Sequence, residues 1–230
     1  SGASVVISQH AGAQEHVQVS RAVHTAVFLA IIVGALTMLL GTFGAPLLLP
    51  ALSTPEDTLQ YSKDYLVWYF AGMIPSMIYN MGSGILRAVG DSKRPLYFLI
   101  AACLINIVLD LLLVVVFHMG VLGVAIATVC SQILSAVLVV ISLMAASGET
   151  YHLSLRQLAF HAQPLKAIMA IGVPTALQSV MYSFSNIVIQ AAINSFGTNA
   201  VAAWTAYGKM DILFWMTLTA MSQALTTFTG

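Results

Sequence analysis

Long runs without a charged residue constrain this chain more than any other feature of its sequence. The run from 95 to 148 contains Asp110 as its only charged residue, and the run from 167 to 208 contains none. A helix of about 20 predominantly apolar residues crosses the hydrocarbon core of a bilayer. Only 7% of the residues are charged, whereas soluble domains have about 25%. The sequence therefore predicts an all-α integral membrane protein, a polytopic helix bundle.

Turn-forming residues divide the uncharged runs into six membrane spans. His118-Met119-Gly120 separates two crossings in the run from 95 to 148, and the turn-rich stretch 194–199 divides the run from 167. An apolar segment that is too short to cross, Ser1–Gln9, has the composition of the end of a helix, so both ends of the chain are expected to be cut. The span cores are expected at about 25–49, 65–86, 95–117, 120–148, 167–193 and 200–230.

The charges and cysteines exclude several classes of protein. Lys and Arg together number eight, as do Asp and Glu, so no basic stripe for nucleic acid exists. Cys103 and Cys130 both lie in apolar runs, which argues against a disulfide framework or a zinc site. The sequence has no H-x-x-x-H, H-E-x-x-H, G-x-S-x-G or P-loop pattern. We expect neither enzyme activity nor a cofactor.

The basic residues alternate between loops. Short cytoplasmic loops are enriched in Lys and Arg. Six of the eight basic residues lie before the first span, after the second and after the fourth, at Arg21, at Arg87, Lys93 and Arg94, and at Arg156 and Lys166, and the alternate loops hold a single one, Lys63. We therefore place these loops in the cytoplasm and the chain in the inner (plasma) membrane of the cell, as a multi-pass protein.

The longest polar stretch, 149–166, predicts a different kind of helix. Leu155, Leu158, Ala159 and Ala162 fall on one face at helical spacing. An amphipathic helix on the inner membrane surface is the natural interpretation. This stretch is also where the chain is expected to pass from one bundle to the next.

Asp110 is the strongest candidate for a functional residue. It lies well inside the third span, and Asn106 precedes it by one turn on the same helical face. Polar groups inside a bilayer are energetically expensive, so they are functional hypotheses by default. We predict that Asp110 and Asn106 bind Na⁺ or H⁺, and a structural, hydrogen-bonded aspartate is the alternative.

Three further polar residues lie in the spans around Asp110. Thr128 is on the fourth span among small residues that allow close helix packing, and its hydroxyl is expected to bond its own helix. Asn80 and Ser83 share a face of the second span. They either line a cavity or serve as packing contacts.

The last two spans also contain polar residues that avoid lipid. A stripe with a spacing of four residues runs along the fifth span, formed by Gln178, Tyr182, Asn186 and Gln190. The stripe faces either a cavity or a partner helix. Lys209 and Asp211, on the last span, are two residues apart and point in different directions. A functional ion site and a buried pairing with another helix are both compatible with them.

Three ordered motifs resemble the multidrug and toxic compound extrusion (MATE) transporters. They are LRAVGDSKRP at 86–95, INIVLD at 105–110 and GVLGVAIAT at 120–128. Gly172-Val-Pro174 is similar to the start of the second bundle in that family, and SQHAGA at 8–13 is similar to the end of its second helix. The resemblance covers essentially the whole chain.

The resemblance implies a fold of twelve helices in two six-helix bundles. On that template the chain begins late in helix two and ends with helix eight. Residues 1–148 are then the remainder of the N-terminal bundle, and 149–166 are a cytoplasmic amphipathic linker. Residues 167–230 are the first two helices of the C-terminal bundle, and the full-length protein is expected to be monomeric.

The resemblance also assigns roles to residues. The N-terminal cation or proton site of the family is implied at Asp110 and Asn106, with Thr128 and either Asn80 or Ser83 contributing. Tyr182 stands where some members carry a glutamate. Lys209 and Asp211 resemble a charged pair of some branches, and a cavity of the C-terminal bundle is implied at Gln178, Tyr182, Asn186, Lys209 and Asp211.

The implied function is a secondary antiporter in the lipid bilayer. It exports drugs or other small organic compounds, often cationic, in exchange for Na⁺ or H⁺, and Na⁺ at Asp110 is the only metal expected. A lipid-linked saccharide flippase of the same superfamily is the alternative, which favours a basic central cavity, and Lys209 is the one basic residue expected inside. A membrane receptor or scaffold is the alternative from another class, and it leaves Asn106 and Asp110 unexplained.

Overall fold

The computed structural model describes residues 2–51, 56–194 and 196–229, and these form helices without a β-strand. Ser1, Ser195 and Gly230, which belong to the expected helix ends and turn, lie outside the described residues. The helices are α1 (Gly2–Gly12), α2 (His16–Ala51), α3 (Glu56–Ala71), α4 (Met73–Ala88), α5 (Lys93–Asp110), α6 (Gly120–Ala145), α7 (Ala162–Asn194) and α8 (Thr198–Thr229). A π-helical segment, η1 (Leu111–Val116), continues α5, and a short 3-10 helix, η2 (Leu155–Gln157), precedes α7.

The all-α membrane fold predicted from the sequence is confirmed. Four helices in the described part of the chain are long and apolar enough to cross a membrane, at His16–Ala45, Lys93–Val116, Gly120–Ala145 and Ala162–Ile193. They correspond to four of the six expected spans. The expected turn after the third span is also present, where His118 and Gly120 adopt positive φ angles of 53° and 54°.

The second expected span, 65–86, is divided into α3 and α4 at Gly72. Pro75 has no N–H to donate to the carbonyl of Ala71, so the helical ladder is interrupted there. The backbone of Gly72 also approaches α6 closely, because a Cβ atom at this position would lie 3.1 Å from Gln132 Oε1 and 3.2 Å from Val129 Cγ2. The sequence predicted one span over 65–86, and the close approach of α6 at Gly72 is a tertiary contact that hydropathy does not show.

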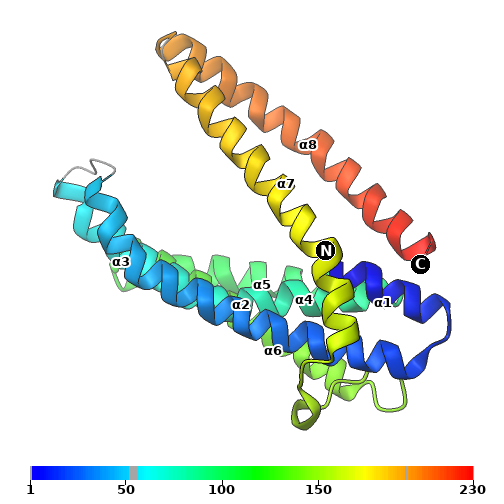
Figure 1. Cartoon of the computed structure of the whole chain (residues 1–230). Helices are drawn as coiled ribbons and strands as arrows, with labels where there is room; N and C mark the ends of the chain where they lie inside the picture. The colour runs from blue at the N-terminus through cyan, green and yellow to red at the C-terminus, as the bar shows by residue number, and fades with distance from the viewer. Residues whose placement is uncertain (1, 52–55, 195, 230) are drawn as a thin grey trace.

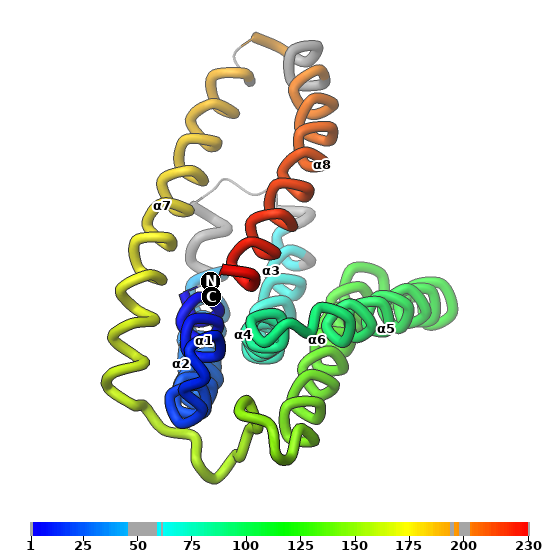
Figure 2. The backbone as a smooth tube through the Cα atoms, turned by 90° about the vertical axis from the view of Figure 1, so that its right-hand side faces the viewer, coloured from blue at the N-terminus to red at the C-terminus, as the bar shows by residue number. Residues whose placement is uncertain are grey.

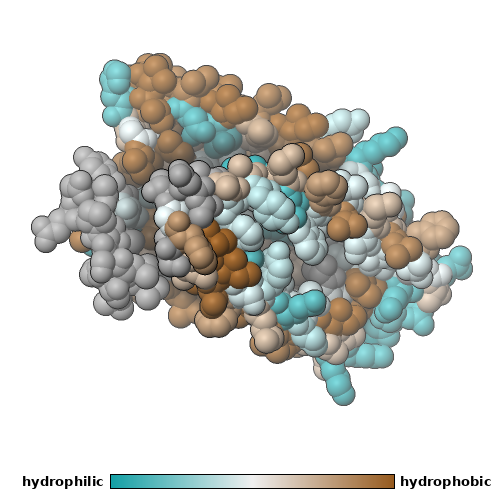
Figure 3. All heavy atoms as spheres, turned by 90° about the horizontal axis from the view of Figure 1, so that it is seen from above, coloured by the Kyte–Doolittle hydropathy of each residue, from teal (hydrophilic) through white to brown (hydrophobic). Residues whose placement is uncertain are grey.

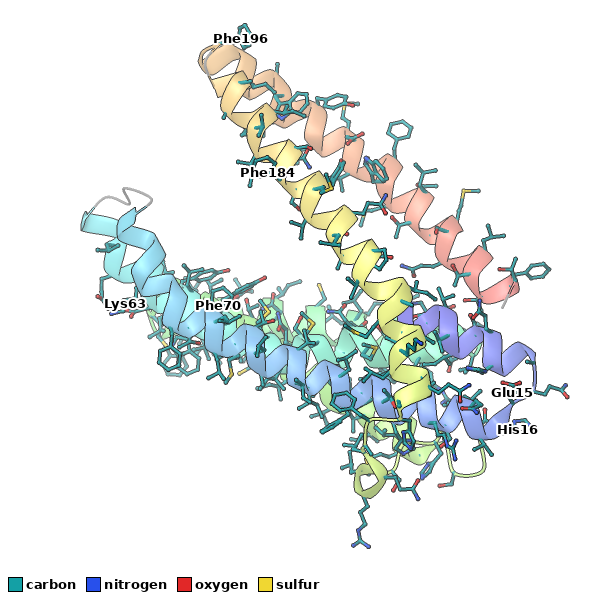
Figure 4. All side chains as sticks on the ribbon, in the orientation of Figure 1. Glu15, His16, Lys63, Phe70, Phe184 and Phe196 are labelled. Carbon is teal, nitrogen blue, oxygen red and sulfur yellow. The ribbon has the colours of Figure 1, made fainter. Side chains whose placement is uncertain are left out.

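Helices α1–α6 pack into one bundle (Figure 1). In Figure 2, α2, α4, α6 and α5 lie in a row, and each contacts the next. The core where α1, α2, α4 and α6 meet is formed by buried aliphatic side chains, among them Ile7, Val23, Leu86 and Leu143. Glu15 and His16 mark the turn from α1 to α2 at one end of this bundle, and Lys63 lies toward the other end (Figure 4).

Helices α7 and α8 form a separate hairpin that diverges from the bundle (Figure 1). Phe196 lies at its tip (Figure 4) and is 78% exposed. Most large apolar side chains of the hairpin are likewise exposed, as expected of surfaces that face lipid or other helices. Apolar residues line the upper edge of the face in Figure 3, and hydrophilic residues gather toward its right-hand end.

The amphipathic helix predicted within 149–166 is wrong. Apart from the single turn η2, the chain between α6 and α7 is irregular up to the start of α7 at Ala162. Leu155 of the predicted apolar face is 53% exposed, whereas Leu153 is buried and its N–H donates to the carbonyl of Leu143. The linker is therefore buried most deeply at Leu153, which lies outside the predicted face, while Leu158 of that face packs against the core only in part.

Side chains of α2 take the place of helical hydrogen bonds in this linker. The N–H of Ser154 donates to His24 Nε2 at 3.1 Å, and the N–H of His161 donates to Thr25 Oγ1 at 3.2 Å. The rings of Phe28 and Phe160 pack with their centroids 4.7 Å apart. Because buried backbone donors need partners, these contacts hold the linker in an extended form against α2.

We expect His24→Ala to loosen the linker and destabilise the protein. His24 is 3% exposed, and its Nδ1 lies 2.7 Å from the carbonyl of Ser20 while Nε2 accepts from Ser154. Removing the ring leaves a shielded N–H without a partner, at a cost of about 1–3 kcal/mol. Thermal unfolding followed by intrinsic fluorescence should show a lower midpoint. His16→Ala changes an exposed ring and is the matched control; equal midpoints for the two variants would contradict this role of His24.

Candidate functional site

Asn106 and Asp110 lie together on the side of α5 that packs on α6. Both are partly buried, and Ala102, one turn before Asn106, is buried on the same face. The Asn106 amide nitrogen and Asp110 Oδ1 are shielded from solvent, and neither has a hydrogen-bond partner among the described residues. A shielded donor or acceptor without a partner costs about 1–3 kcal/mol. The structure thus presents one free donor and one free acceptor a single turn apart.

The backbone changes its geometry directly after Asp110. Residues 111–116 are π-helical, and the N–H of Phe117 donates to the carbonyl of Leu112 at 3.0 Å. Segments of π-helix inside α-helices occur frequently at functional sites. Gly123 of α6 lies against Leu113, because a Cβ atom at Gly123 would be 3.1 Å from Leu113 Cβ. This close approach fixes the position of α6 along α5, and so determines which residues of α6 lie level with Asn106 and Asp110.

Thr128 lies at a similar depth but does not bond Asp110. Since Gly123 faces Leu113 and the two helices run in opposite directions, Thr128 is within about one helical turn of the level of Asp110. Its Oγ1 donates to the carbonyl of Val124 at 2.9 Å. The expected bond of this hydroxyl to its own helix is confirmed.

Asn80 and Ser83 lie farther along the bundle. Gly72 faces Val129, and Asn80 is eight residues beyond Gly72, about 12 Å at 1.5 Å per residue. The side-chain amide of Asn80 donates to the carbonyl of Ser76 at 2.9 Å. Ser83 is buried, and its Oγ donates to the carbonyl of Asn80 and accepts from Arg87. The structure shows no bond from either residue to Asn106 or Asp110.

Asn80 instead lines a pocket of about 590 Å³ between α1, α4 and α8. The C-terminal end of α8 returns to the bundle next to α1 and α4 (Figures 1 and 2), and these three helices supply the residues that line the pocket. Trp215, Ser222 and Gln223 contribute from α8. Arg87 is the one charged residue among those that line it. The pocket therefore combines polar groups and an indole ring with a single cation.

The sequence interpretation missed Arg87, because it placed this residue in the loop after the second span. Arg87 belongs to the last turn of α4 and is partly buried. It follows Asn80 by seven residues, which is two helical turns, so both fall on one face. This spacing is a signal that the sequence contains. The backbone carbonyl of Arg87 also accepts a hydrogen bond of 3.0 Å from Thr227 Oγ1, which ties the end of α8 to α4.

The polar stripe of α7 is divided between two environments. The ring of Tyr182 packs edge-on against Trp215 of α8, with centroids 6.2 Å apart, so this member faces the partner helix. Asn186 and Gln190 line a shallow depression on α7. Gln178 is exposed.

Lys209 and Asp211 do not form a pair in the described part of the chain. Lys209 is exposed and Asp211 is partly exposed. The ion pairs among the described residues are His10–Glu15 and Arg94–Asp91. Lys209 is also absent from the residues lining the pocket between α1, α4 and α8, so the basic residue inside that pocket is Arg87.

Comparison with known proteins places these features in a family context. The MatE family model matches residues 1–112. The chain is 30% identical over 196 residues to the probable multidrug resistance protein YpnP of Bacillus subtilis, covering 83% of this chain and 42% of the relative. It is 27% identical over 234 residues to the probable multidrug resistance protein YoeA of the same organism, covering 99% and 50%. The chain spans about half the length of the curated relatives it matches.

Solved structures show the same fold. A crystal structure of MATE in the bent conformation matches with a TM-score of 0.91 at 24% identity, covering 98% of this chain and 51% of that one. A multidrug resistance MATE family transporter in an outward-facing conformation matches with a TM-score of 0.90 at 24% identity, covering 98% and 50%. The arrangement of bundle and hairpin is thus shared with these transporters.

Proposed function

Because this chain belongs to the MATE family of membrane transporters, we propose that the full-length protein is a secondary antiporter of the inner membrane. It exports small organic compounds in exchange for Na⁺ or H⁺ and acts as a monomer. We assign residues 1–148 to the first bundle, 149–166 to the cytoplasmic linker and 167–230 to the second bundle. The names of the relatives YpnP and YoeA, which describe probable multidrug resistance, support drugs as a cargo class.

The single observation behind ion coupling is the unsatisfied pair on α5. Among the described residues, Asp110 Oδ1 is a shielded acceptor without a partner, and the Asn106 amide nitrogen beside it is a shielded donor without one. A proton or Na⁺ at Asp110 would supply the missing partner for the carboxylate. Carboxylate and carbonyl oxygens are suitable ligands for hard cations, so the carbonyl oxygen of the Asn106 amide completes a donor set with Asp110.

Coupling requires that the ion bind the two transport states unequally. A ligand shifts an equilibrium between two conformations only by its differential affinity for them. The polar pair sits on α5 directly before the π-helical segment, and α6 packs against that segment through Gly123. A change in the charge or coordination of Asp110 would therefore act on the contact between α5 and α6. We propose that this change favours release of the cargo.

An imposed ion gradient should drive cargo efflux from proteoliposomes that contain the full-length protein. We expect an inward Na⁺ gradient at uniform pH, or an inward H⁺ gradient without Na⁺, to drive export of a fluorescent organic dye. The two gradients are applied separately, so the result identifies the coupling ion. Vesicles without protein and vesicles with gradients collapsed by ionophores are the controls. Dye movement that follows neither gradient would refute the antiporter.

The lipid-linked saccharide flippase is the second candidate. Arg87 supports it, since this residue places one cation in the pocket between α1, α4 and α8. A single cation among the lining residues falls short of the basic cavity that such a cargo favours. The flippase alternative gives no role to the unsatisfied polar atoms of Asn106 and Asp110. We therefore rank the flippase below the antiporter.

A further inference from the structure

The pocket between α1, α4 and α8 contains an arginine that has no acidic partner among the described residues. Arg87 is partly buried in the last turn of α4, and one of its terminal nitrogens donates to Ser83 Oγ at 3.2 Å. The guanidinium group has five N–H donors. The ion pairs among the described residues do not include Arg87. A partly buried cation therefore retains most of its donors for another group.

The other residues that line this pocket do not neutralise the cation. They include Asn80 from α4, Ser4 from α1, and Ser222, Gln223 and Thr226 from α8, all of which are uncharged. Lining residues from three helices surround a volume of about 590 Å³, within the range of pockets that bind small molecules, roughly 300–1,000 Å³. Trp215 adds an aromatic surface at the pocket. The charge of the pocket is thus positive, with apolar and hydrogen-bonding walls.

We propose that this pocket binds cargo that bears an anionic group, a carboxylate or a phosphate, and that Arg87 pairs with that group. The proposal rests on the proposed export function and narrows its substrate class, because the family resemblance implied only small organic compounds, often cationic. The planar guanidinium matches a carboxylate or phosphate with two parallel hydrogen bonds. The indole of Trp215 then packs against the organic part of the same cargo.

The site also lies where cargo and conformation can be linked. The carbonyl of Arg87 accepts from Thr227 of α8, so the residue that binds the anion belongs to the contact between α4 and the hairpin. Separation of α8 from α4 opens one wall of the pocket. Binding of an anionic cargo at Arg87 would therefore act directly on the contact between α4 of the bundle and α8 of the hairpin.

A pair of dyes that differ in one carboxylate tests the proposal. Rhodamine 110 is a free acid, and rhodamine 123 is its methyl ester. Binding of each dye to the full-length protein in phosphatidylcholine nanodiscs is measured by fluorescence polarisation. We expect the acid to bind about tenfold more tightly than the ester, which is the scale of a charge-assisted hydrogen bond. Equal or tighter binding of the ester would overturn the proposal.

Variants assign the preference to Arg87. Arg87→Gln should lose the tenfold preference for the acid and keep the Kd for the ester, which also shows that the variant is folded. Gln223→Glu places a carboxylate in the same pocket and should likewise weaken binding of the acid alone. Arg94→Gln is the control, because Arg94 is paired with the carboxylate of Asp91 outside the pocket. Retention of the preference in both pocket variants would overturn the assignment.

Two further outcomes separate this proposal from others. Anionic phosphatidylglycerol in the nanodiscs should leave binding of the acid unchanged, and competition by this lipid would assign the site to a headgroup and overturn cargo binding. Gradient-driven export of the ester with no preference for the acid would leave the antiporter intact and refute the anionic cargo. Preference for the acid without gradient-driven export would support the site and refute the antiporter.

Discussion

We expect Asp110→Asn to abolish gradient-driven export while the full-length protein still reaches the membrane in near-normal amounts. The amide keeps the shape of the side chain and a hydrogen-bonding group next to Asn106, but it binds no proton and no longer provides a charge for Na⁺. An ion that no longer distinguishes the two states cannot shift their equilibrium. Efflux normalised to folded protein is the measurement, and a loss of at least about tenfold corresponds to about 1.4 kcal/mol of coupling.

Two comparison variants make this result specific. Asp91→Asn removes a partly exposed carboxylate that pairs with Arg94 and should leave export unchanged. Asp110→Leu should lower the amount of folded protein as well, because the shielded amide of Asn106 then faces an apolar side chain. If Asp110→Asn exports at the parent rate with its ion dependence intact, Asp110 is structural, and Asp211 becomes the next candidate.

We expect Gly34→Leu to disrupt the bundle and to give the largest loss of stability. A Cβ atom at Gly34 would lie 2.9 Å from the Cα of Ile74, so the backbones of α2 and α4 meet here without room for a side chain. Small residues permit such close approach between membrane helices. Overpacking costs typically about 1–3 kcal/mol and more where backbone must move. The yield of monodisperse protein and its unfolding midpoint should both fall sharply.

Gly44→Leu is the matched control on the same helix. A Cβ atom at Gly44 would have no neighbouring atom within 4 Å. The substitution should therefore change the unfolding midpoint little, and helix propensity favours leucine over glycine. Similar losses in Gly34→Leu and Gly44→Leu would contradict the close contact between α2 and α4.

The sequence predicted most of the fold because its main signals are local. Span lengths follow from the distance between charges, and the turn at His118-Met119-Gly120 follows from its composition. Hydropathy predicted a single span over 65–86, because proline and glycine inside an apolar run are common in membrane helices, whereas the structure divides it at Gly72. Here the break also depends on the approach of α6, which is a tertiary contact.

The amphipathic linker was mispredicted for a related reason. The spacing of Leu155, Leu158 and Ala159 has the helical period, but a period states only which residues would share a face if a helix formed. The linker amides bond instead to His24 and Thr25. Secondary structure in this segment is decided by partners that lie outside it.

The candidate functional residues likewise include some that the sequence predicted and one that only the structure placed in a pocket. Asn106 and Asp110 are one turn apart on one helix, so the sequence by itself determined that they share a face. The structure adds that each has a shielded atom without a partner in the described part of the chain. Arg87 was assigned to a loop, although its spacing from Asn80 placed both on one helical face. Only the return of α8 to α4 shows that this face lines a pocket.

The sequence by itself therefore determined the spans, their order and the polar pair inside the third span, because hydrophobic length and helical period act between neighbours in the chain. Tertiary structure alone decided the extended linker and the pocket of Arg87. His24 and Ser154 are 130 residues apart, and Arg87 and Thr227 are 140 apart. Contacts over such separations depend on how whole helices pack, and no local pattern of apolar and polar residues specifies which distant groups will meet.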